Sequence, residues 1–190
     1  MEKLTKRIKE DGYVIEPDIL KVDSFLNHQI DVALFEDIAE AFKERFKEKP
    51  INKILTIESS GIGLAVITAL QFDKCPVVFV KKGSSKITNK NIYETKVHSF
   101  TKNKDYMAQV SCRYLNAGDH VLIVDDFLAN GEAALGMIDL CKQAGATVEG
   151  VGIVIEKGFQ QGRKRIEEAG YQVESLAIVQ GFDHGKVILE

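Results

Sequence analysis

Five short runs of apolar, mostly β-branched residues divide the chain into an alternating pattern of strand and helix. The runs are KILTI at 53–57, PVVFV at 76–80, HVLIV at 120–124, and two longer ones at 147–155 and 172–179. Helical patterns lie among them at 62–72, 132–144 and 161–169. Apolar strands that alternate with helices indicate a parallel sheet covered on both faces. The sequence therefore predicts an α/β fold, in which ligands bind at the carboxyl ends of the strands.

The N-terminal part predicts two helices separated by a stretch without a clear period. Leu4 and Ile8 stack four residues apart over 2–11, and Gly12 is a natural end for this first helix. Residues 13–30 are expected to be irregular, with Pro17 as an interruption. Asp31 can cap a second helix. Its apolar stripe comprises Leu34, Phe35, Ile38, Phe42 and Phe46.

Composition argues against several classes of protein, including membrane, secreted and nucleic-acid-binding proteins. The 190 residues suit one domain, with 45% hydrophobic and 28% charged residues. No apolar run approaches the roughly 18 residues of a membrane helix, and the N-terminus lacks the apolar core of a secretory signal. We therefore expect a cytoplasmic protein with no membrane contact. The net charge of −3 argues against nucleic acid as the main partner. No metal-binding spacing occurs among Cys75, Cys112, Cys141, His28, His98, His120 and His184.

The segment Val121–Ala134, VLIVDDFLANGEAA, carries the most chemistry. A buried strand leads into two adjacent carboxylates, Asp125 and Asp126, which can accept hydrogen bonds from a ribose diol. A short loop then opens a helix, whose first N–H groups and positive dipole end can hold a phosphate. Gly131 permits close approach because it has no Cβ. The alternative interpretation is that the two acids only end a strand and cap a turn.

Two other nucleotide motifs fit less well. A strand that ends in two acids also resembles the second motif of P-loop proteins, but their GxxxxGK[ST] partner is missing and the spacing of Gly158 and Gly162 is wrong for it. A dinucleotide fingerprint would need a third glycine where Val66 stands. It would also need an acid after the strand that ends at Val80, and none is present.

The segment VLIVDDFLANGEA resembles the fingerprint by which type I phosphoribosyltransferases bind 5-phosphoribosyl 1-pyrophosphate (PRPP). The resemblance implies that Asp125 and Asp126 grip the ribose 2′- and 3′-hydroxyls. It also implies that a loop wraps the 5′-phosphate, formed by Ala129, Asn130, Gly131, Glu132 and Ala133. Many family members have Thr at the position of Asn130, and either side chain can bond a phosphate oxygen.

Three further segments are in register with this family. The loop Ser59, Ser60 and Gly61 stands where the family binds pyrophosphate. Lys81 and Lys82 either neutralise a polyphosphate or form a solvated basic pair, and Lys81 is the favoured catalytic candidate of the two. The polar stretch 83–91, continuing to about residue 100, resembles the family's mobile loop. Runs 93–100 and 108–114 are predicted to pair as strands.

The ends of the chain indicate which base is used. The stretch LKVDSFLNHQ at 20–29, VIEK at 154–157 and YQVESL at 171–176 resemble the bacterial family members that act on xanthine. The resemblance implies a single domain over 1–190, with a twisted parallel sheet flanked by helices. A small hood would come from about 1–30 and the C-terminal segment. Xanthine needs donors, which Lys157 and Asn27 supply, while Leu20 would pack on its ring. The alternatives are that Lys157 is a surface lysine paired with Glu156, that Asn27 is a helix-entry or turn residue, and that Leu20 packs in the core.

The implied reaction joins a purine nitrogen to the ribose anomeric carbon and displaces pyrophosphate. We expect catalysis by positioning and electrostatics, with Mg²⁺ bound mainly through PRPP and no protein nucleophile. Asp126 or a water could take the purine proton. Two alternatives stay open: a transferase that prefers adenine or another purine, and a regulator that senses PRPP and binds DNA. The family also implies a homodimer.

Overall fold

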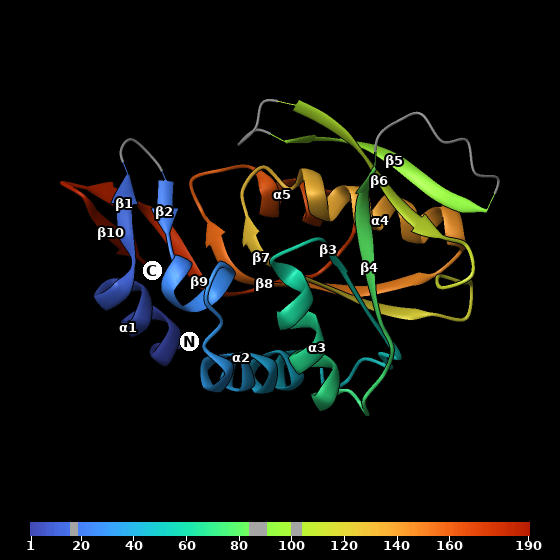
Figure 1. Ribbon diagram of the computed structural model, residues 1–190, viewed down its shortest axis with the longest axis horizontal. Helices are drawn as coiled ribbons and strands as arrows, with labels where there is room; N and C mark the ends of the chain where they lie inside the picture. Colours follow the sequence, from blue (N-terminus) through green and yellow to red (C-terminus); the bar gives the residue numbers. More distant parts are fainter. Residues whose placement is uncertain (16–18, 84–90, 100–103) are drawn as a thin grey trace.

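The computed structural model describes residues 1–15, 19–83, 91–99 and 104–190 (Figure 1). Within them the chain forms one eight-stranded sheet, in the order β10-β9-β8-β7-β3-β4-β6-β5. The five central strands are mutually parallel, as the apolar runs predicted. They are β3 (Lys53–Ile57), β4 (Val77–Gly83), β7 (His120–Leu128), β8 (Thr147–Lys157) and β9 (Val173–Asp183).

Antiparallel strands extend both edges of this parallel core. Strands β5 (Ile92–Ser99) and β6 (Lys104–Ser111) pair with each other, and β6 also pairs with β4. The predicted strand pair is thus confirmed, although its second strand lies about four residues earlier than expected. At the other edge β10 (Lys186–Leu189) pairs with β9. Strand β10 was not predicted, because a run of four residues is too short to show a period.

Helices cover the two faces of the sheet. Figure 1 shows α2 (Val32–Arg45) and α3 (Gly61–Gln71) on one side, and α4 (Glu132–Ala144) and α5 (Gly162–Glu168) on the other. Successive strand residues point to opposite faces. Accordingly, Leu122 and Val124 of β7 join the core under α2 and α3, whereas Val121 and Ile123 join the core under α4. The predicted two-faced core is confirmed.

Helix α2 follows its sequence pattern closely. The Asp31 carboxylate accepts a hydrogen bond from the Leu34 N–H at 3.1 Å, which confirms it as the N-terminal cap. All five residues of the predicted apolar stripe are buried. Helix α4 also begins and ends where the sequence indicated, with Gly145 in the left-handed conformation after its last turn.

The N-terminal segment is more ordered than expected. Helix α1 (Glu2–Asp11) is confirmed, and Leu4 and Ile8 are fully buried. The expectation of irregular structure over 13–30 is wrong. Strands β1 (Tyr13–Ile15) and β2 (Ile19–Lys21) pair antiparallel, and a π-helical turn, η1 (Asp23–Asn27), follows. Pro17 lies outside the described residues. Helix α1 and β1 pack beside β10, so the two ends of the chain meet (Figure 1).

Candidate active site

The two adjacent carboxylates lie inside β7 and not after it. The prediction placed the strand end at Val124, but pairing with β8 continues from Asp125 opposite Ile153 to Leu128 opposite Glu156. Side chains alternate along a strand. The Asp125 side chain is therefore on the α4 face and is only 7% exposed. Asp126 points to the other face, where its Oδ2 accepts a hydrogen bond from Asn27 Nδ2 at 3.3 Å.

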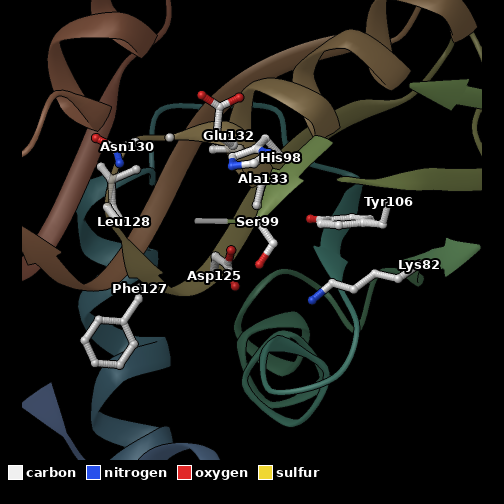
Figure 2. A pocket seen from close by; sticks show the side chains of 13 residues that line it. Lys82, His98, Ser99, Tyr106, Asp125, Phe127, Leu128, Asn130, Glu132 and Ala133 are labelled. Carbon is white, nitrogen blue, oxygen red and sulfur yellow. The ribbon is translucent and has the colours of Figure 1, made fainter. Parts of the chain in front are cut away.

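A cavity of about 200 Å³ opens at the carboxyl end of β7. Figure 2 shows Lys82 and Tyr106 on one side of it, Leu128 and Asn130 on the other, and Asp125 between them. All five residues of the predicted phosphate loop line it: Ala129, Asn130, Gly131, Glu132 and Ala133. The structure therefore brings the loop and the first carboxylate of the predicted site to one hollow.

The loop ends at the first turn of α4, where N–H groups have no partner within the helix. Gly131 is the residue before the helix and has a φ of 83°. This left-handed conformation is strained for residues with a Cβ, which explains why glycine stands here. The positive end of the helix dipole thus faces the same hollow as the loop, which suits an anion.

The carboxyl of Asp125 is in an unusual electrostatic state. Burial raises its pKa well above the ordinary aspartate value, and the neighbouring charge of Asp126 raises it further. Lys82 acts in the opposite direction. Burial, together with Asp125 and Glu132, raises the pKa of Tyr106 to about 12. The cavity therefore favours a neutral Asp125 carboxyl, or a cationic group beside it when that carboxyl is ionised.

The structure separates the two adjacent lysines. Lys82 lines the cavity, with its Nζ 5.4 Å from the centre of the Tyr106 ring. Lys81, the favoured catalytic candidate, lines a different hollow together with Phe79 and Tyr114. Alternation along β4 explains the difference, because neighbouring residues of a strand face opposite sides. The backbone N–H of Lys82 also donates to Glu58 Oε1 at 2.6 Å, which links the end of β4 to the loop that follows β3.

The predicted pyrophosphate loop lies beside the buried carboxylate. It follows β3 and begins with a cis peptide bond between Glu58 and Ser59. A side-chain carbon added at Gly61 would lie 3.5 Å from Asp125 Oδ1, so the loop is within contact range of that carboxylate. Ser59 and Ser60 precede Gly61 at the same end of the sheet. The loop, the strand and the cavity therefore share one edge.

The three predicted base-binding residues come from separate elements. Asn27, at the end of η1, reaches Asp126 as described, so the N-terminal segment touches the carboxylate pair. Lys157 is the last residue of β8. The carboxylate of Glu156, the neighbour suggested as its alternative partner, accepts hydrogen bonds from Arg163 and Ser175. Leu20 on β2 is 6% exposed and belongs to the hydrophobic core.

Sequence reasoning missed part of the cavity lining. His98, Ser99 and Tyr106 come from β5 and β6, which were predicted only as a strand pair. Arg165 of α5, which contacts the phosphate loop, was not considered either. A cluster of three basic residues at 163–165 was the available signal, but its contacts depend on tertiary structure. Of the predicted mobile loop, residues 84–90 and 100 lie outside the described residues, whereas Ile92–Ser99 forms strand β5.

A parallel α/β sheet with adjacent carboxylates beside a phosphate-accepting helix start defines an enzyme that handles a ribose phosphate. The comparison with known families agrees: the model of the phosphoribosyl transferase domain matches residues 21–184. The chain belongs to the phosphoribosyltransferase family, and the predicted type I fold is confirmed.

Its relatives extend over the whole chain. It is 60% identical over 190 residues to xanthine phosphoribosyltransferase of Clostridium novyi, which covers 100% of both chains. It is 58% identical over 187 residues, or 98% of both chains, to xanthine phosphoribosyltransferase 2 of Clostridium botulinum. Among solved structures, adenine phosphoribosyltransferase of Rhodothermus marinus matches with a TM-score of 0.76 and 26% identity. That match covers 94% of this chain and 100% of the other.

Proposed function

We propose that the protein transfers the 5-phosphoribosyl group of PRPP to xanthine, giving xanthosine 5′-monophosphate and pyrophosphate in purine salvage. The observation that carries the proposal is the cavity in which the whole loop 129–133 meets the buried carboxylate of Asp125. The full-length relatives named for xanthine favour that base over other purines.

Each group has a role in this scheme. Residues 129–133 hold the 5′-phosphate by backbone N–H groups, and Asp125 and Asp126 hold the ribose hydroxyls. Residues 59–61 take the pyrophosphate at the neighbouring strand end. Displacing pyrophosphate leaves positive charge on the sugar ring, which the two carboxylates stabilise. We assign the neutralising role within one chain to Lys82, because it lines the cavity and Lys81 does not.

Mg²⁺ fits this site as a partner of the substrate. In the described part of the chain, no group of three or more His, Cys, Asp or Glu side chains is placed to hold a metal ion. The ion would bind mainly through PRPP oxygens, and Asp125 and Asp126 would be candidate hard oxygen donors. When bound, it would neutralise the leaving pyrophosphate. The protein residues bind, orient and exclude water.

The base site is proposed to lie between the hood and the end of β8. The hood comprises α1, β1, β2, η1 and β10, on a single domain that spans 1–190. Lys157 and Asn27 would donate to the exocyclic oxygens of xanthine, and Leu20 would pack on its ring. The contact of Asn27 with Asp126 supports this placement, since it brings the hood next to the ribose-binding carboxylates.

We also propose a homodimer that works in the cytoplasm. No described helix is long and apolar enough to span a membrane. Phe79 and Tyr114, 40% and 60% exposed, line an apolar hollow together with Lys81. Exposed apolar surface of this kind commonly marks a protein interface. Sedimentation equilibrium of Phe79→Glu against the unmodified protein tests the dimer, and a monomer in both samples would overturn it.

The reaction is tested by incubating the protein with PRPP, Mg²⁺ and each purine in turn. Rapid conversion of xanthine with adenine ignored is the expected result. Conversion of adenine would contradict the base assignment and leave the transferase intact. PRPP binding without turnover of any base would favour the DNA-binding regulator, which a gel shift would then test.

A further inference from the structure

Helix α5 touches the phosphate loop through backbone as well as side chains. The Gly162 N–H donates to the Ala129 carbonyl at 3.0 Å. A Cβ on Gly162 would lie 2.4 Å from that carbonyl oxygen, and one on Gly131 would lie 3.1 Å from Gly162 Cα. Only glycine allows such an approach from both sides. The loop is therefore seated against the start of α5.

Arg165 of α5 fastens the loop at two further points. Its Nη1 donates to the Asn130 carbonyl at 2.5 Å and to Glu132 Oε1 at 2.5 Å. In a trans peptide the carbonyl and the following N–H point in opposite directions. Holding the Asn130 carbonyl toward α5 therefore turns the Gly131 N–H away from α5.

The second contact, between Arg165 and Glu132, offsets a negative charge beside the loop. Glu132 is the acidic residue of the first turn of α4 and lines the cavity. A free carboxylate here would repel a phosphate held by the loop. Figure 2 shows the Glu132 carboxylate directed away from Asp125, and Arg165 binds it there. The side chains of Arg165 and Glu132 are 38% and 28% exposed, so the pair is only partly screened by solvent.

We propose that Arg165 is a positioning residue for the 5′-phosphate of the substrate. It fixes the Asn130–Gly131 peptide and neutralises Glu132, and it makes this loop competent to bind a phosphate. The inference rests on the proposed function, in which loop 129–133 receives the 5′-phosphate. Other basic residues of α5 are placed differently: Arg163 binds Glu156, and Lys164 is near Glu168 on the surface.

The test measures binding of two probes by calorimetry, ribose 5-phosphate and inorganic pyrophosphate, to the full chain. Arg165→Met should weaken ribose 5-phosphate about tenfold or more, the scale of one charge-assisted hydrogen bond, and change pyrophosphate less than about twofold. Arg165→Lys keeps the charge but loses the planar geometry, so its loss should be smaller. Lys164→Met removes the same charge from the same helix and should bind both probes normally.

Glu132→Gln combined with Arg165→Met separates the charge effect from folding. The double variant should regain part of the lost affinity, because the repulsion is gone while the Asn130 carbonyl still lacks its partner. Equal weakening of both probes, or no weakening at all, would overturn the role of Arg165. An unmodified protein that binds neither probe would instead refute the proposed function. Thermal unfolding of each variant checks that it is folded under the conditions of the binding measurement.

Discussion

The two ends of the candidate site are built in opposite ways. At the phosphate end, β7, the loop 129–133 and α4 are continuous in sequence, although α5 contacts the loop and β4, β5 and β6 complete the cavity wall. At the proposed base end, Leu20 and Asn27 come from the neighbouring β2 and η1, whereas Lys157 comes from β8, more than a hundred residues later. The phosphate end can therefore be recognised as one motif. The base end exists only once the hood has packed against the sheet.

This contrast has a chemical consequence. Phosphate is recognised by backbone N–H groups and a helix start, which any sequence with the right turn can present. A purine is distinguished by side-chain donors aimed at particular atoms. Changes at the phosphate end should therefore affect every reaction of the enzyme, whereas changes at the base end should affect the choice of base.

The largest expected effect is at the phosphate end. Asp126→Ala removes a carboxylate that is proposed to hold a ribose hydroxyl and that also accepts from Asn27. We expect kcat/KM to fall about 10²-fold for every purine used, the upper end of the range for loss of a hydrogen bond to a charged group, because the charge of the carboxylate is lost as well. Steady-state kinetics with xanthine and hypoxanthine measures this. A loss confined to one base would contradict the distinction between the phosphate end and the base end.

Lys157→Met should give the next largest effect, and a selective one. Loss of the donor should raise the KM for xanthine about tenfold, the scale of one hydrogen bond to a charged group, and leave the KM for PRPP within about twofold. Steady-state kinetics with each substrate varied in turn shows whether the KM for xanthine rises while the KM for PRPP does not. Lys164→Met, a surface change on α5, is the control. An equal rise in both KM values would place Lys157 outside the base site.

A smaller effect separates the adjacent lysines. Lys82→Met should raise the KM for PRPP several-fold, on the order of a partly exposed charge interaction, because Lys82 lines the cavity. Lys81→Met should act only through the proposed dimer, since Lys81 lines the apolar hollow. Assays across a range of protein concentration distinguish the two. Equal, concentration-independent losses would favour the original prediction for Lys81.

The smallest effect concerns stability. Because the folded-state pKa of Asp125 is raised, at pH values between the ordinary aspartate pKa and the raised one the native chain holds a proton there that the unfolded chain has released. This contribution is fully present below the ordinary aspartate pKa and is lost as pH rises through the raised pKa. Asp125→Asn should therefore be more stable than the unmodified protein at pH 7.5, with the advantage shrinking toward pH 4. Urea unfolding at both pH values measures it, and a constant difference would contradict it.

The sequence predicted the parallel strands, α2, α4 and the phosphate loop, because each depends on local patterns of apolar and capping residues. It failed for β1, β2 and β10, whose three or four residues are too few to show a period. The sequence-based prediction also ended β7 too early, at Val124, because two adjacent aspartates are typical of the end of a strand. Pairing with β8 keeps Asp125 and Asp126 in the strand.

The sequence by itself determined the fold class, the family and the loop that suits a phosphate, since those follow from neighbours in the chain. Only the tertiary structure decided that Lys82 rather than Lys81 lines the cavity, that Glu156 binds Arg163, and that Arg165 fastens the loop. These depend on which face of a strand meets which helix. That outcome is set by packing across the whole sheet and not by any one segment.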